Sequence, residues 1–156
     1  MQFFPLALSI AVLAGIWTYF SGQFNLLTWP AFVGWALFFA SGGNAESVKK
    51  VFFPAVCGVI LGYLAVVCAP YLGGPAVGVA VGVTIIAFIM VMLAPIDIFA
   101  FVPAQFACCA AFFGTGAKFW PTIIPLVIGI VLGYISAILP NLFTKQGKKD
   151  SAAQEG

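Results

Sequence analysis

Residues 102–116 read Val-Pro-Ala-Gln-Phe-Ala-Cys-Cys-Ala-Ala-Phe-Phe-Gly-Thr-Gly, an apolar segment that opens beside a proline and closes on small residues. Residues 29–43 follow the same plan, with Trp-Pro at the start, Phe-Phe towards the end and Ser-Gly-Gly behind it. As a helix, each apolar run counted from its proline (Pro30 or Pro103) would cover only about 16 Å. Because a bilayer core is about 30 Å thick, the pair predicts two Pro-interrupted elements that are not ordinary spanning helices.

The repetition extends to the neighbouring segments. Residues 54–63 and 125–134 share a proline, two glycines, a leucine and a tyrosine at matching positions. Such self-similarity indicates a duplicated unit. We therefore predict two repeats of three elements, residues 1–72 and 73–142, followed by a polar tail at residues 143–156.

Composition sets the class of protein. With 63% hydrophobic and 6% charged residues, the chain could not cover a soluble globule with polar surface. We predict one all-α integral membrane domain in contact with the lipid bilayer. The chain has no His and a net charge of +2, which gives no footprint for nucleic acid. Its four Cys lack the spacing of a metal site, so no metal or cofactor is expected.

The lysines test the number of crossings. Six membrane elements place both termini and Lys49-Lys50 on one side and leave Lys118 alone on the other. Five crossings would divide the lysines of the tail from Lys49-Lys50. The charge pattern therefore favours six elements with both termini cytoplasmic. Whether the Pro-interrupted elements are re-entrant or kinked spanning helices stays open at this point.

An odd number of elements in each repeat has a geometric consequence. Two homologous three-element repeats in one membrane must point in opposite directions. In such inverted-topology folds, sites lie near the midplane beside matched broken helices. The backbone N–H groups after Pro30 and Pro103 would then open toward the interior and could attract a carbonyl oxygen or an anion.

Three ordered runs carry a family resemblance: residues 26–34 (Leu-Leu-Thr-Trp-Pro-Ala-Phe-Val-Gly), 101–107 (Phe-Val-Pro-Ala-Gln-Phe-Ala) and 125–134. They resemble the YcdZ-type small bacterial inner-membrane proteins, a domain-of-unknown-function family. The resemblance implies a polytopic fold in the bacterial inner membrane and brings no established activity. The family's pattern has a small hydroxyl residue and a glycine in the places of Gln105 and Ala107, so the contacts of that stretch are expected to differ here.

The candidate solute path centres on Gln105, which lies on the first turn of the second short helix within an apolar stretch. A buried amide needs partners, and Gln105 could equally line a polar path or bond to another helix. Phe39 and Phe113 could frame the path as apolar constrictions. Ordinary packing is the favoured interpretation of both phenylalanines.

Three further polar residues lie near the ends of the short helices. Thr28 and Thr115 could offer hydrogen bonds to a solute, although a cap at Thr28 and a turn at Thr115 account for them. Asp97 is the one acid inside the apolar block, and an ionisable group within a membrane is a functional candidate by default. Because Asp97 follows Pro95 at a helix junction, an N-cap is the favoured explanation.

Small residues recur at the spacing that lets membrane helices approach closely, either within one protomer or between protomers. The glycines in this pattern are Gly58, Gly62, Gly78, Gly82, Gly129 and Gly133.

The residues present exclude most enzyme chemistry, because the chain has no His and no paired carboxylates in its apolar segments. We predict a channel or facilitator for a small uncharged or weakly polar solute. Its narrow path would run between the two short helices of each protomer in a homo-oligomer. The alternatives are a non-transporting subunit of a larger complex, such as an uptake-complex component or an assembly factor, and a proton-coupled transporter.

Overall fold

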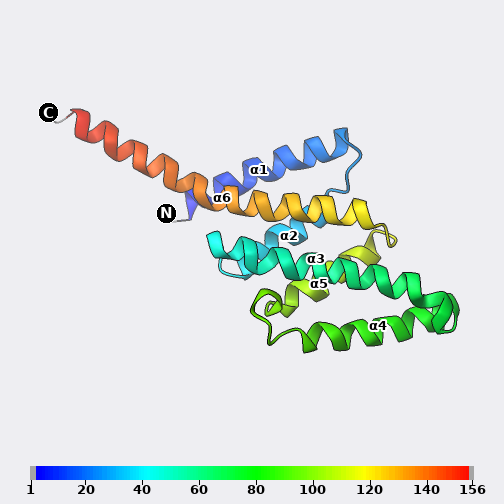
Figure 1. The fold of residues 1–156 in the computed structure, drawn as a ribbon. Coiled ribbons are helices and arrows are strands. Elements are labelled where there is room, and N and C mark those ends of the chain that lie inside the picture. The colour runs from blue at the N-terminus through cyan, green and yellow to red at the C-terminus, as the bar shows by residue number, and fades with distance from the viewer. Residues whose placement is uncertain (1–2, 155–156) are drawn as a thin grey trace.

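The computed structural model describes residues 3–154, with side chains as far as Pro140. Within this range the chain forms α-helices and two short 3₁₀ helices, and no β-strand (Figure 1). The prediction of an all-α protein is confirmed. In chain order the elements are α1 (Phe4–Gln23), α2 (Trp29–Ala40), α3 (Ala45–Cys68), η1 (Ala69–Leu72), α4 (Gly74–Met92), η2 (Asp97–Phe99), α5 (Val102–Gly114) and α6 (Phe119–Gln154).

Four helices are long and apolar enough to cross a membrane: α1, α3 continued by η1, α4, and α6 as far as Pro140. The helices α2 and α5 have 12 and 13 residues, which corresponds to about 18–20 Å. Both carry a proline in the first turn, where the missing N–H group costs little. Beyond Pro140, α6 continues to Gln154 through the tail that the sequence marked only as polar.

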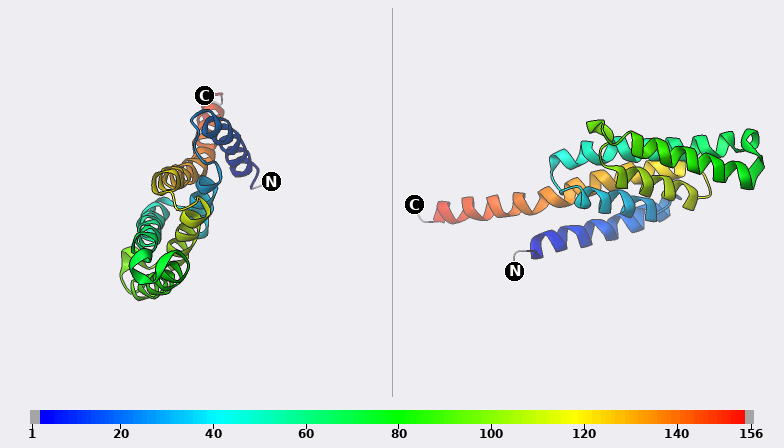
Figure 2. Two further views of the ribbon diagram at one scale, coloured as in Figure 1. Left: turned by 90° about the vertical axis from the view of Figure 1, so that its right-hand side faces the viewer. Right: turned by 90° about the horizontal axis from the view of Figure 1, so that it is seen from below.

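The helices form two groups of three. In one group α1 and α2 pack on α6, and in the other α4 and α5 pack on α3. Each short helix therefore makes its main contacts with the third helix of the other half of the chain. The helices α3 and α6 run in opposite directions and join the two groups, while α1 and α4 lie at the two extremes of the array (Figures 1 and 2).

The core lies where the two groups meet. Apolar side chains from α2, α3, α5 and α6 fill this region. They pack the space between the two short helices. The buried members of the core are Leu37, Val51, Ala55, Val59, Ala104, Cys108, Ala111, Phe112, Leu126 and Ile130.

The glycines of α3 and α6 lie against the two short helices. A Cβ atom at Gly129 would overlap the carbonyl oxygen of Ala31, and one at Gly58 would overlap that of Gln105. Gly58 lies near the middle of α3, and Gly129 lies near the middle of the apolar part of α6, Phe119–Pro140, so α2 and α5 begin partway along these helices. The aromatic contacts of the next turn also match, with the ring of Phe38 against Gly133 and that of Phe112 against Gly62.

The remaining predicted packing glycines, Gly78 and Gly82, lie on α4. Gly78 faces Ala69, the first residue of η1, and Gly82 faces Ala65 in the last turn of α3. All six glycines thus make their close contacts within one chain.

The matched contacts correct the sequence alignment of the short helices. Ala31 corresponds to Gln105, and Phe38 corresponds to Phe112. The sequence separation within each of these pairs is one residue greater than the separation between Pro30 and Pro103. The difference arises because α5 is one residue longer than α2.

Ring pairs agree with this shifted correspondence. The rings of Phe38 and Tyr134 are 6.4 Å apart at 75°, and those of Tyr63 and Phe112 are 6.4 Å apart at 82°. These edge-on geometries are the ones that aromatic pairs prefer.

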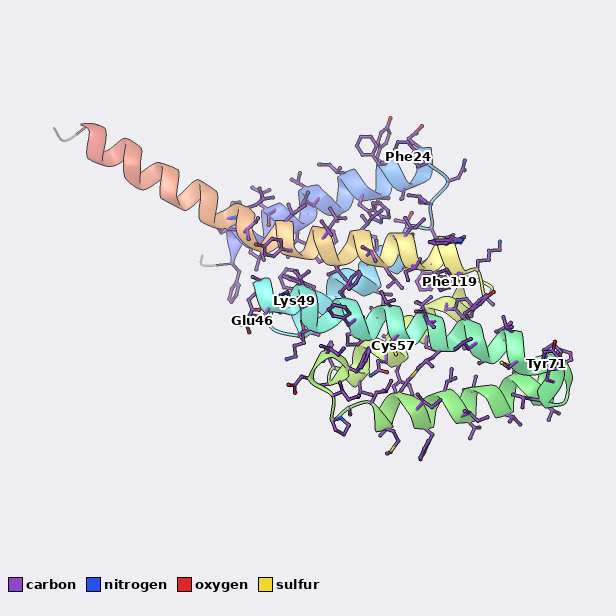
Figure 3. The ribbon with its side chains drawn as sticks, in the orientation of Figure 1. Phe24, Glu46, Lys49, Cys57, Tyr71 and Phe119 are labelled. Carbon is purple, nitrogen blue, oxygen red and sulfur yellow. The ribbon has the colours of Figure 1, made fainter. Side chains whose placement is uncertain are left out.

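The charged loops lie at the two ends of the array. Glu46 and Lys49 lie at the end where α3 begins, whereas Tyr71 and Phe119 lie towards the other end (Figure 3). The start of α3 is fixed by a capping box, in which the Asn44 side chain accepts from the Ser47 N–H at 3.1 Å. Lys118 directly precedes α6 and so lies at the end opposite Lys49.

Candidate functional site

Gln105 is completely buried in the first turns of α5. Its Nε2 donates to the carbonyl oxygens of Phe99 at 2.9 Å and Met90 at 3.4 Å. Its Oε1 accepts a weak bond from the Cys57 thiol at 3.7 Å. The two carbonyls belong to the last turns of η2 and α4, where a helix leaves such groups without an internal partner. In this structure, therefore, the Gln105 amide ties α5 to η2, α4 and α3.

The faces of α2 and α5 that point away from the core line two apolar cavities. Phe113 borders a cavity of about 290 Å³ between α4 and α5, together with Met90 and Cys109. Phe39 borders a cavity of about 220 Å³ between α1 and α2, together with Trp35. The two predicted phenylalanines are thus not brought together, since each faces a cavity of its own group.

The two cavities correspond to each other residue by residue. In each group, four residues of the short helix form one wall of the cavity. The same sequence separation relates each of the four α2 residues to its counterpart in α5. Spacings of three, four and seven residues place such side chains on one face of a helix. The positions are Phe32, Trp35, Ala36 and Phe39 in α2, and Phe106, Cys109, Ala110 and Phe113 in α5.

The first turns of both short helices lack a side-chain cap. Thr28 occupies the N-cap position of α2 but makes no cap hydrogen bond, so that prediction is wrong. Its hydroxyl instead shares a 2.7 Å hydrogen bond with that of Ser21. Pro30 is buried and Pro103 is exposed. The N–H groups that follow the prolines therefore gain no partner from a capping side chain.

Thr115 lies at the far end of α5 from Gln105 and closes the turn into α6. Its hydroxyl donates to the Phe112 carbonyl at 2.8 Å and shares a hydrogen bond with the Thr122 hydroxyl. The predicted turn accounts for these contacts. The structure thus places Thr115 and Gln105 in separate environments.

Asp97 differs from its expected N-cap role. It is the first residue of η2, is exposed, and makes no cap hydrogen bond, because Ile96 occupies the N-cap position. The carboxylate lies at the end of the array where α3 begins, beside Lys49 and Lys50. It is therefore separate from the buried surroundings of Gln105.

Sequence reasoning missed a polar cluster in the α1, α2 and α6 group. The indole N–H of Trp35 donates to the Ser136 hydroxyl at 3.1 Å, and the Ser9 hydroxyl donates to the Ser136 carbonyl at 2.8 Å. Ser136 itself donates to the Gly133 carbonyl at 2.7 Å. A serine one turn beyond a packing glycine in an apolar span was the signal for this cluster.

The Ser136→Ala variant tests the cluster. It leaves the Trp35 indole N–H buried without its partner, which we expect to lower the free energy of unfolding by about 1–2 kcal/mol. Thermal unfolding in detergent measures the change. Thr84→Ala is the control, because the exposed Thr84 hydroxyl bonds only to the Ala80 carbonyl of its own helix. Equal stability of both variants would show that the Trp35 bond contributes nothing.

Comparison with known proteins places the chain beside uncharacterised membrane proteins. The family described as "Protein of unknown function (DUF1097)" matches residues 7–141. The chain is 30% identical over 136 residues to "Inner membrane protein YcdZ" of Escherichia coli strain K12, covering 83% of this chain and 80% of that protein. It is also 30% identical over 135 residues to the protein of the same name from Salmonella typhimurium strain LT2, covering 83% and 81%. No solved structure matches.

Proposed function

Because the chain belongs to the DUF1097 family, whose compared members are named inner membrane proteins, we propose that it is an inner-membrane facilitator for small uncharged or weakly polar solutes. Two repeats of opposite orientation form its six membrane elements, with both termini in the cytoplasm. The path runs beside the two short helices, where hydrogen bonds come from Gln105 and from the first-turn N–H groups that lack a side-chain cap, apart from that of Ala104, which donates to the Phe101 carbonyl at 3.0 Å. A homo-oligomer would carry one such path in each protomer.

The reciprocal packing of the short helices is the observation that carries the proposal. The contact of α2 with Gly129 of α6 is matched by that of α5 with Gly58 of α3, while α3 and α6 run in opposite directions. A two-fold axis in the membrane plane relates such pairs. Inverted repeats with paired broken helices are the architecture in which membrane transport sites are built.

The contacts of Gln105 suggest where the path opens. Met90 lines the cavity between α4 and α5, and its carbonyl accepts a bond from the Gln105 amide. A shift of the last turn of α4 would release this bond and turn the amide toward the cavity. The conformation described here is then the closed one, because the Gln105 amide is bound to the Met90 and Phe99 carbonyls.

Solute flux into liposomes of purified protein tests the proposal. Light scattering after an osmotic step reports entry of glycerol, urea or other small uncharged solutes. We expect faster entry than in protein-free liposomes, with no dependence on a proton gradient. Flux that requires a proton gradient would instead identify a coupled transporter, for which the exposed position of Asp97 provides no buried titratable site.

The filled core favours one alternative, a non-transporting membrane subunit. Such a protein needs no path, and its packed centre would serve only as a scaffold. Liposomes without solute flux, prepared from protein that unfolds at the same temperature as before reconstitution, would support this function over a facilitator.

A further inference from the structure

A hollow of about 310 Å³ lies between the start of α3 and η2. It is at the end of the array where α3 begins, where Figure 3 shows Glu46 and Lys49. Residues from segments far apart in the sequence form its walls, and they combine charged with apolar side chains. The lining residues are Glu46, Lys49, Lys50, Phe53, Asp97 and Ile98.

The charged groups of the hollow balance, with two lysines against two carboxylates. All four are exposed, and no ion pair joins them within the part of the chain that the structure describes. The Nζ atom of Lys50 lies 5.7 Å from the centroid of the Phe101 ring, a cation–π distance that directs it toward α5. Both signs of charge are therefore presented side by side, and neither is taken up by an ion pair among the described residues.

The apolar residues of the hollow extend it toward the hydrocarbon. Glu46, Lys49, Lys50 and Phe53 form one stripe on α3, because they are separated by helical spacings of three, four and seven residues. Since α3 is of spanning length, this stripe passes from the first, charged turns into the apolar part of the helix. Phe53 is 43% exposed and Ile98 is 51% exposed, so both offer apolar surface beside the charges.

We propose that this hollow binds the headgroup of an ethanolamine phospholipid from the surrounding membrane. The lysines pair with the phosphate, and the carboxylates of Glu46 and Asp97 accept hydrogen bonds from the ammonium group. The acyl chains then begin over Phe53 and Ile98.

Other headgroups fit the hollow less well. A purely anionic headgroup would leave the two carboxylates facing a like charge. A choline headgroup has no N–H to donate to them.

Native mass spectrometry of the full-length protein with an equal mixture of defined lipids tests this site. We expect ethanolamine lipid to be retained about fivefold over choline lipid, as for a solvent-exposed charge pair. The double variant Glu46→Gln/Asp97→Asn should lose this preference. The double variant Lys49→Gln/Lys50→Gln should retain less of both lipids. Lys118→Gln, an exposed lysine at the opposite end, is the control and should match the wild-type protein.

Several results would overturn the site. Equal retention of ethanolamine and choline lipids would remove the role of the carboxylates, as would an unchanged preference in Glu46→Gln/Asp97→Asn. Stronger retention of glycerol-headgroup lipid would indicate attraction of anions by the lysines alone. Displacement of the lipid by free phosphoethanolamine at equal concentration would point to a soluble zwitterion as ligand. Unchanged thermal unfolding of each variant ensures that retention reports the site.

Discussion

Alanine at Gly58 or Gly129 is expected to destabilise the protein by about 3 kcal/mol, at the upper end of the usual cost of an overpacked core. The added Cβ atom would meet backbone, the carbonyl group of Gln105 or of Ala31, and not the end of a flexible side chain. Neither contact can relax without moving a short helix away from its long partner. Thermal unfolding in detergent measures the loss.

Gly15 of α1 provides the matched control. A Cβ atom at this helical glycine would meet nothing within 4 Å, so Gly15→Ala should be neutral or stabilising by up to about 1 kcal/mol through helix propensity. Because Gly58 and Gly129 are equivalent in the proposed repeats, their alanine variants should lose similar amounts. If both variants are as stable as Gly15→Ala, the close approach of the short helices is absent from the folded protein.

Leucine at Gln105 is expected to reduce solute flux about tenfold or more. The substitution removes the amide that donates to the carbonyl of Met90, a residue that lines the cavity between α4 and α5. Loss of a hydrogen bond to the solute, worth about 1–3 kcal/mol, raises the barrier to entry by that energy and slows flux about tenfold or more. The carbonyls of Met90 and Phe99 also lose their partner, so stability should fall by about 1–3 kcal/mol. Light-scattering assays on liposomes measure the flux.

Two controls separate flux from folding in the Gln105→Leu variant. Cys57→Ala removes only the weak thiol contact to the amide and should keep wild-type flux. Ser136→Ala lowers stability in the other group of helices, where its partner Trp35 lines the cavity between α1 and α2 and not the one between α4 and α5, and should also keep its flux. If Gln105→Leu transports as well as these variants, Gln105 has no part in the path.

Much of the fold could be predicted because membrane helices leave strong signals. The apolar runs gave the long helices, and Pro30 and Pro103 gave the starts of the short ones. The glycine spacing indicated the contacts of Gly58 and Gly129, since only small residues allow backbones to approach closely.

The partners in those contacts could not be predicted. Glycine spacing shows which face of a helix is packed but not which helix covers it, so the reciprocal packing of α2 on α6 and α5 on α3 required coordinates. The one-residue shift between the short helices is visible in the sequence only at the Phe-Phe pairs, whose spacing is one residue greater than that of the two prolines, and the prolines that mark the helix starts do not show it.

The candidate site was predicted less well than the fold. Gln105 was identified as a buried amide, but the Met90 and Phe99 carbonyls that bind it lie in a break between helices whose geometry sequence patterns do not specify. Phe39 and Phe113 were expected to share one path, and the structure separates them into corresponding cavities. The correspondence is what the proposed duplication would produce, since equivalent faces of α2 and α5 would then meet equivalent surroundings.

The orientation of the two repeats is tested most directly by labelling the starts of α3 and α6 in intact cells. Ala45 is the first residue of α3 and Lys118 directly precedes α6, and both are exposed. Ala45→Cys and Lys118→Cys, each made in a chain carrying Cys68→Ser because Cys68 is an exposed thiol, are treated with a membrane-impermeant maleimide. We predict that Lys118→Cys is labelled from outside and that Ala45→Cys is labelled only after the membrane is permeabilised. Labelling of both cysteines from the same side would contradict the opposite orientation of the repeats.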